Sequence, residues 1–177
     1  ADDNPVISYH GTDGEGLKVA TCSNTTCTSA TITTVHETST DSGWSSIAIG
    51  DDDNPIVSTY DYVSNSLLIA FCGNPTCTSS TVNTLDDSSG GWSSIAIGAG
   101  NKPVIAYGGL SDSTLLVAAC TDTTCSSMTQ TSLGVSIAQP LGLSRSERGI
   151  EIAIGTDDKP VIVFTDPDGN VSIAECS

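Results

Sequence analysis

Short apolar runs alternate along the whole chain with turns rich in Gly, Asp, Asn and Ser. The segment GWSSIAIG occurs at 43–50 and again at 91–98, and a shorter form, GIEIAIG, occurs at 149–155. After each copy come an acidic or polar turn, an apolar run that begins with proline, and a second apolar run that ends in cysteine. In the first two copies a run rich in Ser and Thr follows. Such a repeat has to be recognised first, because it decides the architecture.

Two landmarks keep nearly the same step along the chain. The prolines that open the apolar runs stand 50, 48 and 57 residues apart: Pro5, Pro55, Pro103 and Pro160. The cysteines that close the following runs stand 50, 48 and 56 residues apart: Cys22, Cys72, Cys120 and Cys176. A period near 50 residues that contains four short strands has the length of a β-propeller blade.

Each repeat predicts four strands. First strands are expected at 46–50, 94–98 and 151–155, and second strands at 5–9, 55–60, 103–107 and 160–164. Third strands are expected at 17–22, 67–72, 115–120 and 171–176, and fourth strands at 28–35, 78–85 and 126–133. The first three strands of a repeat are almost continuously apolar, which is typical of sheets covered on both faces. The predicted fold class is all-β, a propeller-like array of about 3.5 four-stranded repeats in one domain, 1–177, with units 1–44, 45–92, 93–149 and 150–177.

The predicted array has open ends. It starts at the second strand of one repeat and stops at the third strand of another, whereas propellers close with about four to eight blades. We therefore expect exposed strand edges and an uncovered sheet face at both ends. Other copies of the chain are expected to cover them, in a closed dimer or a head-to-tail fibre. The alternative is an excerpt of a longer chain that carries the missing blades.

The cysteines predict a disulfide framework. Three pairs have four residues between their members, at the hairpin between the third and fourth strands: Cys22 and Cys27, Cys72 and Cys77, Cys120 and Cys125. Cross-strand neighbours in a hairpin come close to disulfide reach, and the spacing does not suit zinc. Three local disulfides indicate a secreted or cell-surface protein. The odd Cys176 indicates an intermolecular bond, a free thiol or an excised fragment.

The charge excludes some partners. Five Lys and Arg stand against 21 Asp and Glu, a formal net charge of −16. Such a field repels phosphate backbones and anionic membranes, so nucleic-acid binding is not expected. No apolar run approaches the roughly 20 residues that span a bilayer, so membrane insertion is not expected either. The chain begins with Ala1 and no signal peptide is recognised, which suggests a processed or excerpted form.

Two irregular features have alternative interpretations. Trp44 and Trp92, each just before a first strand, are expected to pack between blades; the alternative is an exposed aromatic binding platform. The extra residues 135–149 in the third repeat carry both arginines, Arg145 and Arg148. An insertion at one joint of a repeat array maps to a loop, either an assembly contact or an ordinary surface loop.

Candidate chemistry is sparse. His10 and His36 are expected to be solvated at strand ends, no catalytic residue is assigned, and the chain is not expected to be an enzyme. Asp51, Asp52 and Asp53 are weak Ca²⁺ candidates, but they lack the alternating pattern of a dedicated calcium loop and fit a turn better. No other cofactor is expected. Sequons at Asn24 and Asn170 permit glycosylation.

The unit WSSIAIG, DDDNPIVSTYD, SLLIAFC and TSSTVNTL resembles the tandem blades of secreted bacterial β-propeller repeat proteins. The resemblance covers nearly the whole chain except about 137–149. It implies a propeller-like fold, whereas activity does not follow from it, since such repeats serve adhesins, lectins and enzyme scaffolds alike. The expected function is a non-catalytic extracellular protein that assembles with copies of itself. The alternative is a glycan- or ligand-binding module, or a fragment of a larger surface protein.

Overall fold

The computed structural model describes residues 3–12, 14–37, 44–87, 91–109, 113–138 and 149–176. Within these ranges the regular structure consists of 14 strands in four antiparallel sheets. The predicted all-β class is confirmed, and every predicted strand overlaps an observed one. None of the four sheets closes on itself in the described ranges, so the sheets alone do not establish a propeller.

The strands of each sheet follow one another in space as they do in sequence. The first sheet holds β1 (Val6–His10), β2 (Leu17–Cys22) and β3 (Ala30–His36), and the second holds β4 (Ser45–Ile49), β5 (Pro55–Asp61), β6 (Ser66–Cys72) and β7 (Ser80–Asp86). The third holds β8 (Ser93–Gly98), β9 (Lys102–Gly108), β10 (Thr114–Cys120) and β11 (Met128–Ser136), and the fourth holds β12 (Ile150–Ile154), β13 (Pro160–Thr165) and β14 (Val171–Glu175).

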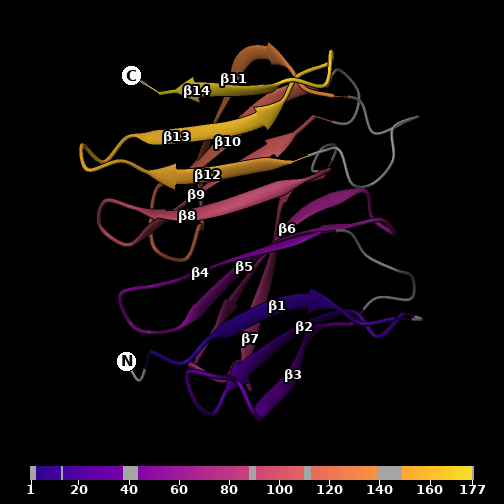
Figure 1. The fold of residues 1–177 in the computed structure, drawn as a ribbon, viewed down its shortest axis with the longest axis vertical. Helices are drawn as coiled ribbons and strands as arrows, with labels where there is room; N and C mark the ends of the chain where they lie inside the picture. Colours follow the sequence, from indigo (N-terminus) through magenta and orange to yellow (C-terminus); the bar gives the residue numbers. More distant parts are fainter. Residues whose placement is uncertain are drawn as a thin grey trace.

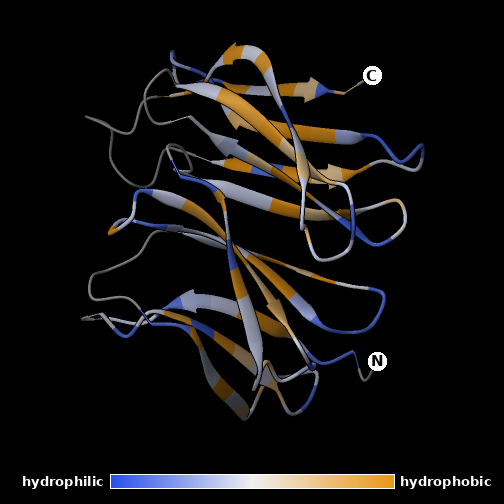
Figure 2. Cartoon of the chain, turned by 180° about the vertical axis from the view of Figure 1, so that it is seen from behind, coloured by the Kyte–Doolittle hydropathy of each residue, from blue (hydrophilic) through white to orange (hydrophobic). Residues whose placement is uncertain are grey.

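The four sheets follow one another along the long axis, with the first and last at opposite ends (Figure 1). Neighbouring sheets meet most closely at their first strands, where β4 lies against β8 and β8 against β12. Hydrophobic residues concentrate in the strands and hydrophilic residues in the turns, as Figure 2 shows. The packing between sheets, rather than a single central core, therefore holds the chain together.

Each sheet has a forward face, toward the next sheet in the chain, and a backward face, toward the preceding one. Side chains alternate between the two faces along a strand. Three hydrophobic clusters fill the three interfaces between sheets, each combining a forward face with a backward face. The first cluster, for example, joins Leu17 and Val19 of the first sheet to Val57, Ala70 and Cys72 of the second. This explains the nearly continuous apolar runs, because both faces of an inner sheet are buried.

The two serines of the repeated segment also join the sheets. Ser93 Oγ donates to Ser58 Oγ at 3.0 Å inside the second interface, and Ser45 Oγ donates to Ser8 Oγ at 2.9 Å in the first. The next serine along accepts a backbone N–H from the following sheet, at 3.2 Å from Ile95 N to Ser46 Oγ. Serine therefore recurs because its small hydroxyl satisfies polar groups where the first strand of one sheet meets the neighbouring sheet.

The third interface replaces the serine pair with an apolar pair. Ala106 stands at the repeat position of Ser58, and Ile150 stands at the position of Ser93. Both are buried in the same cluster. The exchange removes both hydroxyls together, which avoids leaving either one buried without a partner.

The expectation that residues 135–149 form a loop is wrong for their first part. β11 continues to Ser136, and a register shift opposite Thr114 to Leu116 accommodates its extra residues. Ile137 and Ala138 are buried between the third and fourth sheets, where Ala138 N donates to Thr165 O at 2.9 Å. Apolar residues in this stretch were the signal that sequence reasoning passed over. Arg145 and Arg148 lie outside the described residues.

The buried serine pair predicts a non-additive double mutant. Replacing Ser58 or Ser93 alone with Ala leaves one hydroxyl buried, which should lower the free energy of unfolding by about 1–3 kcal/mol. The double replacement should cost less than the sum, because it removes both hydroxyls together, as the third interface does. Urea unfolding of the cycle measures the coupling. The half-buried pair Ser8 and Ser45 is the matched control, and strict additivity at Ser58 and Ser93 would contradict the role assigned to them.

Candidate functional site

The three predicted disulfides are present. Cys22 is joined to Cys27, Cys72 to Cys77 and Cys120 to Cys125, with Cα–Cα distances of 4.9, 4.7 and 4.8 Å. The second cysteine of each pair has a positive φ, between 51° and 54°. The hairpin thus turns through a left-handed residue while the disulfide holds its two ends together.

A polar side chain two residues after the first cysteine caps each turn. Asn24 Oδ1 accepts from the backbone N of Thr26 and of Thr28, both at 3.2 Å. Asp122 Oδ1 does the same with Thr124 N and Ser126 N, at 2.9 and 3.1 Å. Hydrogen bonds from the side chain and backbone of Ser126 and from Thr124 lower the pKa of Asp122, since they stabilise the carboxylate.

Two of the disulfides differ in how they contribute to packing between sheets, so removing them should lower the free energy of unfolding by different amounts. Loop-closure entropy for these short rings gives about 2 kcal/mol each. Cys72 and Cys77 are both buried in the first interface between sheets, whereas Cys27 is only half-buried and Cys22, although buried, lies on the backward face of the first sheet. Replacing the inner pair with alanine should therefore lower the free energy of unfolding more than replacing the outer pair. Urea unfolding compares the two variants.

The thiol count controls that experiment. Denatured, unreduced protein should titrate one thiol per chain where Cys176 is free beside the three disulfides, and none where Cys176 forms an intermolecular bond. Seven thiols would contradict the pairing, since the chain contains seven cysteines.

Cys176 is half-buried just after β14. Its backbone N donates to Pro160 O at 3.0 Å, which continues the ladder between β13 and β14. Its side chain packs against the third hydrophobic cluster and lines an open groove of about 530 Å³ between the third and fourth sheets. Cys176 has no disulfide partner within the chain, and the three alternatives of an intermolecular bond, a free thiol or an excised fragment stay predictions.

The calcium candidates lie in the turn between β4 and β5. Asp52 Oδ1 accepts from Asn54 N at 3.2 Å, and Asp53 has a φ of 62°. Asp51 N donates to Asn101 Oδ1 at 2.9 Å, which links this turn to the equivalent turn of the third sheet. Among the described residues, no group of three or more His, Cys, Asp or Glu is arranged to hold a metal ion. Calcium binding stays a weak prediction.

The two sequon asparagines lie in hairpin turns. Asn24 Nδ2 donates to Thr28 Oγ1 at 2.7 Å, and Asn170 N donates to Asp166 Oδ1 at 2.9 Å. The hydrogen bonds from Asn170, with its backbone N–H contributing most, lower the pKa of Asp166. Glycosylation at either asparagine stays a prediction.

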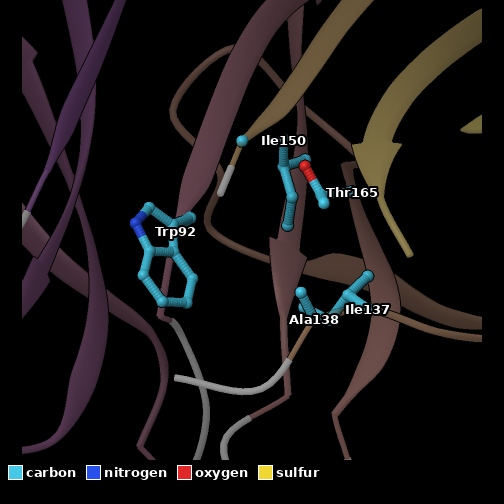
Figure 3. A pocket seen from close by; sticks show the side chains of 6 residues that line it. Trp92, Ile137, Ala138, Ile150 and Thr165 are labelled. Carbon is cyan, nitrogen blue, oxygen red and sulfur yellow. The ribbon is translucent and has the colours of Figure 1, made fainter. Parts of the chain in front are cut away.

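The two tryptophans contact each other between neighbouring sheets. The ring centroids of Trp44 and Trp92 are 5.1 Å apart and tilted by 48°. Trp92 also faces Ile150 and Ile137 across a cavity of about 10 Å³ (Figure 3). That volume is about the size of one water molecule and far below that of a sugar. The packing role is the better interpretation of Trp92, while Trp44 remains about one third exposed.

The expectation that both histidines are solvated is wrong for His10. Its Nε2 lies 2.9 Å from Thr59 Oγ1, across the interface between the first and second sheets. Burial lowers the pKa of His10 below its ordinary value of 6.5, and the nearby charge of His36 lowers it further. The interface therefore favours the neutral imidazole.

His10 predicts a loss of stability in mild acid. Its folded pKa lies below its unfolded pKa, so its contribution is present above about pH 6.5 and is lost as the pH falls toward the folded value. Urea unfolding between pH 7.5 and about pH 5 should show this loss, and His10→Gln should reduce it. His36→Gln, followed by NMR of the imidazole, should raise the pKa of His10. A pKa of His10 at or above 6.5 in the folded protein would contradict the assignment.

The two outermost sheet faces are the largest departure from the burial pattern of the repeat. The head face is the forward face of the fourth sheet, with Val163, Val171 and Ile173 exposed. Val171 is 75% exposed, whereas the residues at its repeat position, Leu17, Leu67 and Leu115, are fully buried. Ile173 is 65% exposed, whereas its equivalents Val19, Ile69 and Val117 are buried.

The tail face is the backward face of the first sheet. It carries Ile7 and Ile32, 47% and 58% exposed, with Tyr9 and Lys18 beside them. The residues at the repeat position of Ile7 are all fully buried: Val57, Ile105 and Ile162. The sequence predicted an uncovered face at each end but did not single out these residues. The sequence could have identified them, because they are apolar at repeat positions where the other sheets bury apolar residues.

The chain matches no protein-family model and no curated protein. In the described part of the chain, no helix is long and apolar enough to cross a membrane. The structural features that bear on function are the head face, the tail face and the three disulfide turns.

Proposed function

We propose that this chain is a non-catalytic structural protein of the cell exterior or surface that assembles with copies of itself, into a fibre or a closed oligomer. In this proposal the sheets are propeller-like blades, with β4, β8 and β12 lying toward a common axis. The observation that carries it is the exposure of Val171, at a repeat position that is fully buried in each of the three preceding sheets. An exposed apolar sheet face, at positions that are buried in the other sheets, is typical of a surface that binds a partner.

The energy available from these faces is modest. Fully burying a Val or Ile side chain contributes about 1.5–3 kcal/mol, and the five residues of the two faces are only partly exposed. Association costs about 4–15 kcal/mol in lost translational and rotational freedom. The two amounts are similar, so assembly should depend on protein concentration.

The net charge of −16 acts against contact between copies. At low salt this repulsion reaches far, whereas the Debye length falls to about 3 Å at 1 M salt. Added salt should therefore strengthen assembly.

The disulfides bear on the location. Three local disulfides fit an oxidising environment. We therefore propose an extracellular or cell-surface location, where such disulfides persist. Copies of the same chain are the proposed partners, and the strong negative charge argues against nucleic acid.

A second candidate function is a glycan- or ligand-binding module. One observation favours it: Trp44 is about one third exposed and its ring lies 5.1 Å from that of Trp92. This candidate predicts a monomer whose tryptophan fluorescence changes on adding saccharides.

Imaging tests the first proposal. Unreduced protein in negative stain should show fibres or uniform multimers, and sedimentation should show a mass that rises with protein concentration and with salt up to about 1 M. Val171→Lys should weaken assembly, because it buries a charge in an apolar contact. Val63→Lys is the matched control, since Val63 is also exposed but lies in the turn between β5 and β6. A monomer at every concentration and salt would overturn the proposal.

A further inference from the structure

We propose that the partner of the head face is the tail face of a second copy, docked as one inner sheet docks on the next. This inference rests on the proposed function and specifies its contact. The contact is heterologous, because two different surfaces meet. A head and a tail then remain free at the two ends of any open assembly.

The internal interfaces show what covers a forward face. In all three of them a forward face packs against a backward face, with equivalent strand positions in contact. The head face is a forward face without a following sheet in the described chain, and the tail face is a backward face without a preceding one. The docking of head on tail thus continues an interface that the fold already uses three times.

The repeat also predicts which side chains meet. One position in each sheet lies three residues before the cysteine that ends the third strand. Its side chain shares a hydrophobic cluster with the residue two positions after the proline that opens the second strand of the next sheet. The three observed pairs are Val19 with Val57, Ile69 with Ile105, and Val117 with Ile162. The same rule pairs Ile173 of one copy with Ile7 of the next. A second rule joins the residue five positions before that cysteine to the residue four positions after that proline. It is seen in the pairs Leu67 with Tyr107 and Leu115 with Phe164. Between two copies, the same rule pairs Val171 with Tyr9.

Charge favours head on tail over head on head. Glu175 lies on the head face by its register with Val161, and a head-on-head contact would bring two such carboxylates together. The strands of the tail face carry Lys18 instead, whose Nζ lies 3.1 Å from Glu15 Oε2 at the edge of that face. Like charges across a contact select against the wrong pairing.

A mixing experiment tests the polarity. The head-blocked variant carries Val171→Lys and Ile173→Lys, and the tail-blocked variant carries Ile7→Lys and Ile32→Lys. Each alone should be monomeric, because burying unpaired ammonium groups should raise the Kd by about 100-fold or more. An equal mixture should form a dimer with one copy of each, since one intact head and one intact tail remain. Sedimentation and native mass spectrometry read the stoichiometry.

Val63→Lys, with the same added charge in a turn, should assemble like the wild type. Dimers of the tail-blocked variant alone would show a head-on-head contact and overturn the inference while leaving self-assembly intact. A mixture that stays monomeric beside an assembling wild type would also overturn it. A wild type that never assembles would overturn this inference and the proposed function together.

Cysteine trapping covers the case in which a lysine variant fails to fold. In a Cys176→Ser background, Ile173→Cys and Ile7→Cys copies are mixed with oxidised glutathione, which takes up the two electrons released as the two thiols join. The cross-link should form between unlike copies, about tenfold faster than between two Ile173→Cys copies. Equal rates would overturn the predicted pairing of Ile173 with Ile7.

Discussion

The structure depends on one constraint: each sheet is apolar on both faces, so each face needs a cover. The inner sheets meet it through their neighbours, and the three hydrophobic clusters are those shared interfaces. The pair of Ser58 and Ser93 and the disulfide of Cys72 and Cys77 lie buried within these interfaces. Apolar contact between sheets supplies most of the burial, and the head face and the tail face are the two sheet faces that no sheet of the described residues covers.

Much of this fold could be predicted from the sequence, because a repeat states the same pattern several times. The strand positions followed from the repeated apolar runs, and the three disulfides followed from the spacing of the cysteines. Contacts between repeats could not be read in this way. The bond between His10 and Thr59, and the burial of Ile137, depend on how one sheet rests on the next, which a period does not record.

The candidate site was predictable only in outline. An open-ended array implied uncovered faces, but it took the register of β13 with β14 to place Val163, Val171 and Ile173 on one face. The local turns were clearer, since Asn24 and Asp122 cap hairpins whose geometry is set within a few residues. Arg145 and Arg148, which the sequence suggested as assembly contacts, lie outside the described residues and remain a suggestion.

The change from a serine pair to the pair of Ala106 and Ile150 makes the sheets non-interchangeable. A first strand that carries serine suits the second interface, and one that carries isoleucine suits the third. Unequal recombination that moved the fourth unit behind the second would set Ile150 against Ser58, a larger side chain against a buried hydroxyl that has lost its partner. A chain that had lost its third unit would therefore be destabilised by this single mismatch.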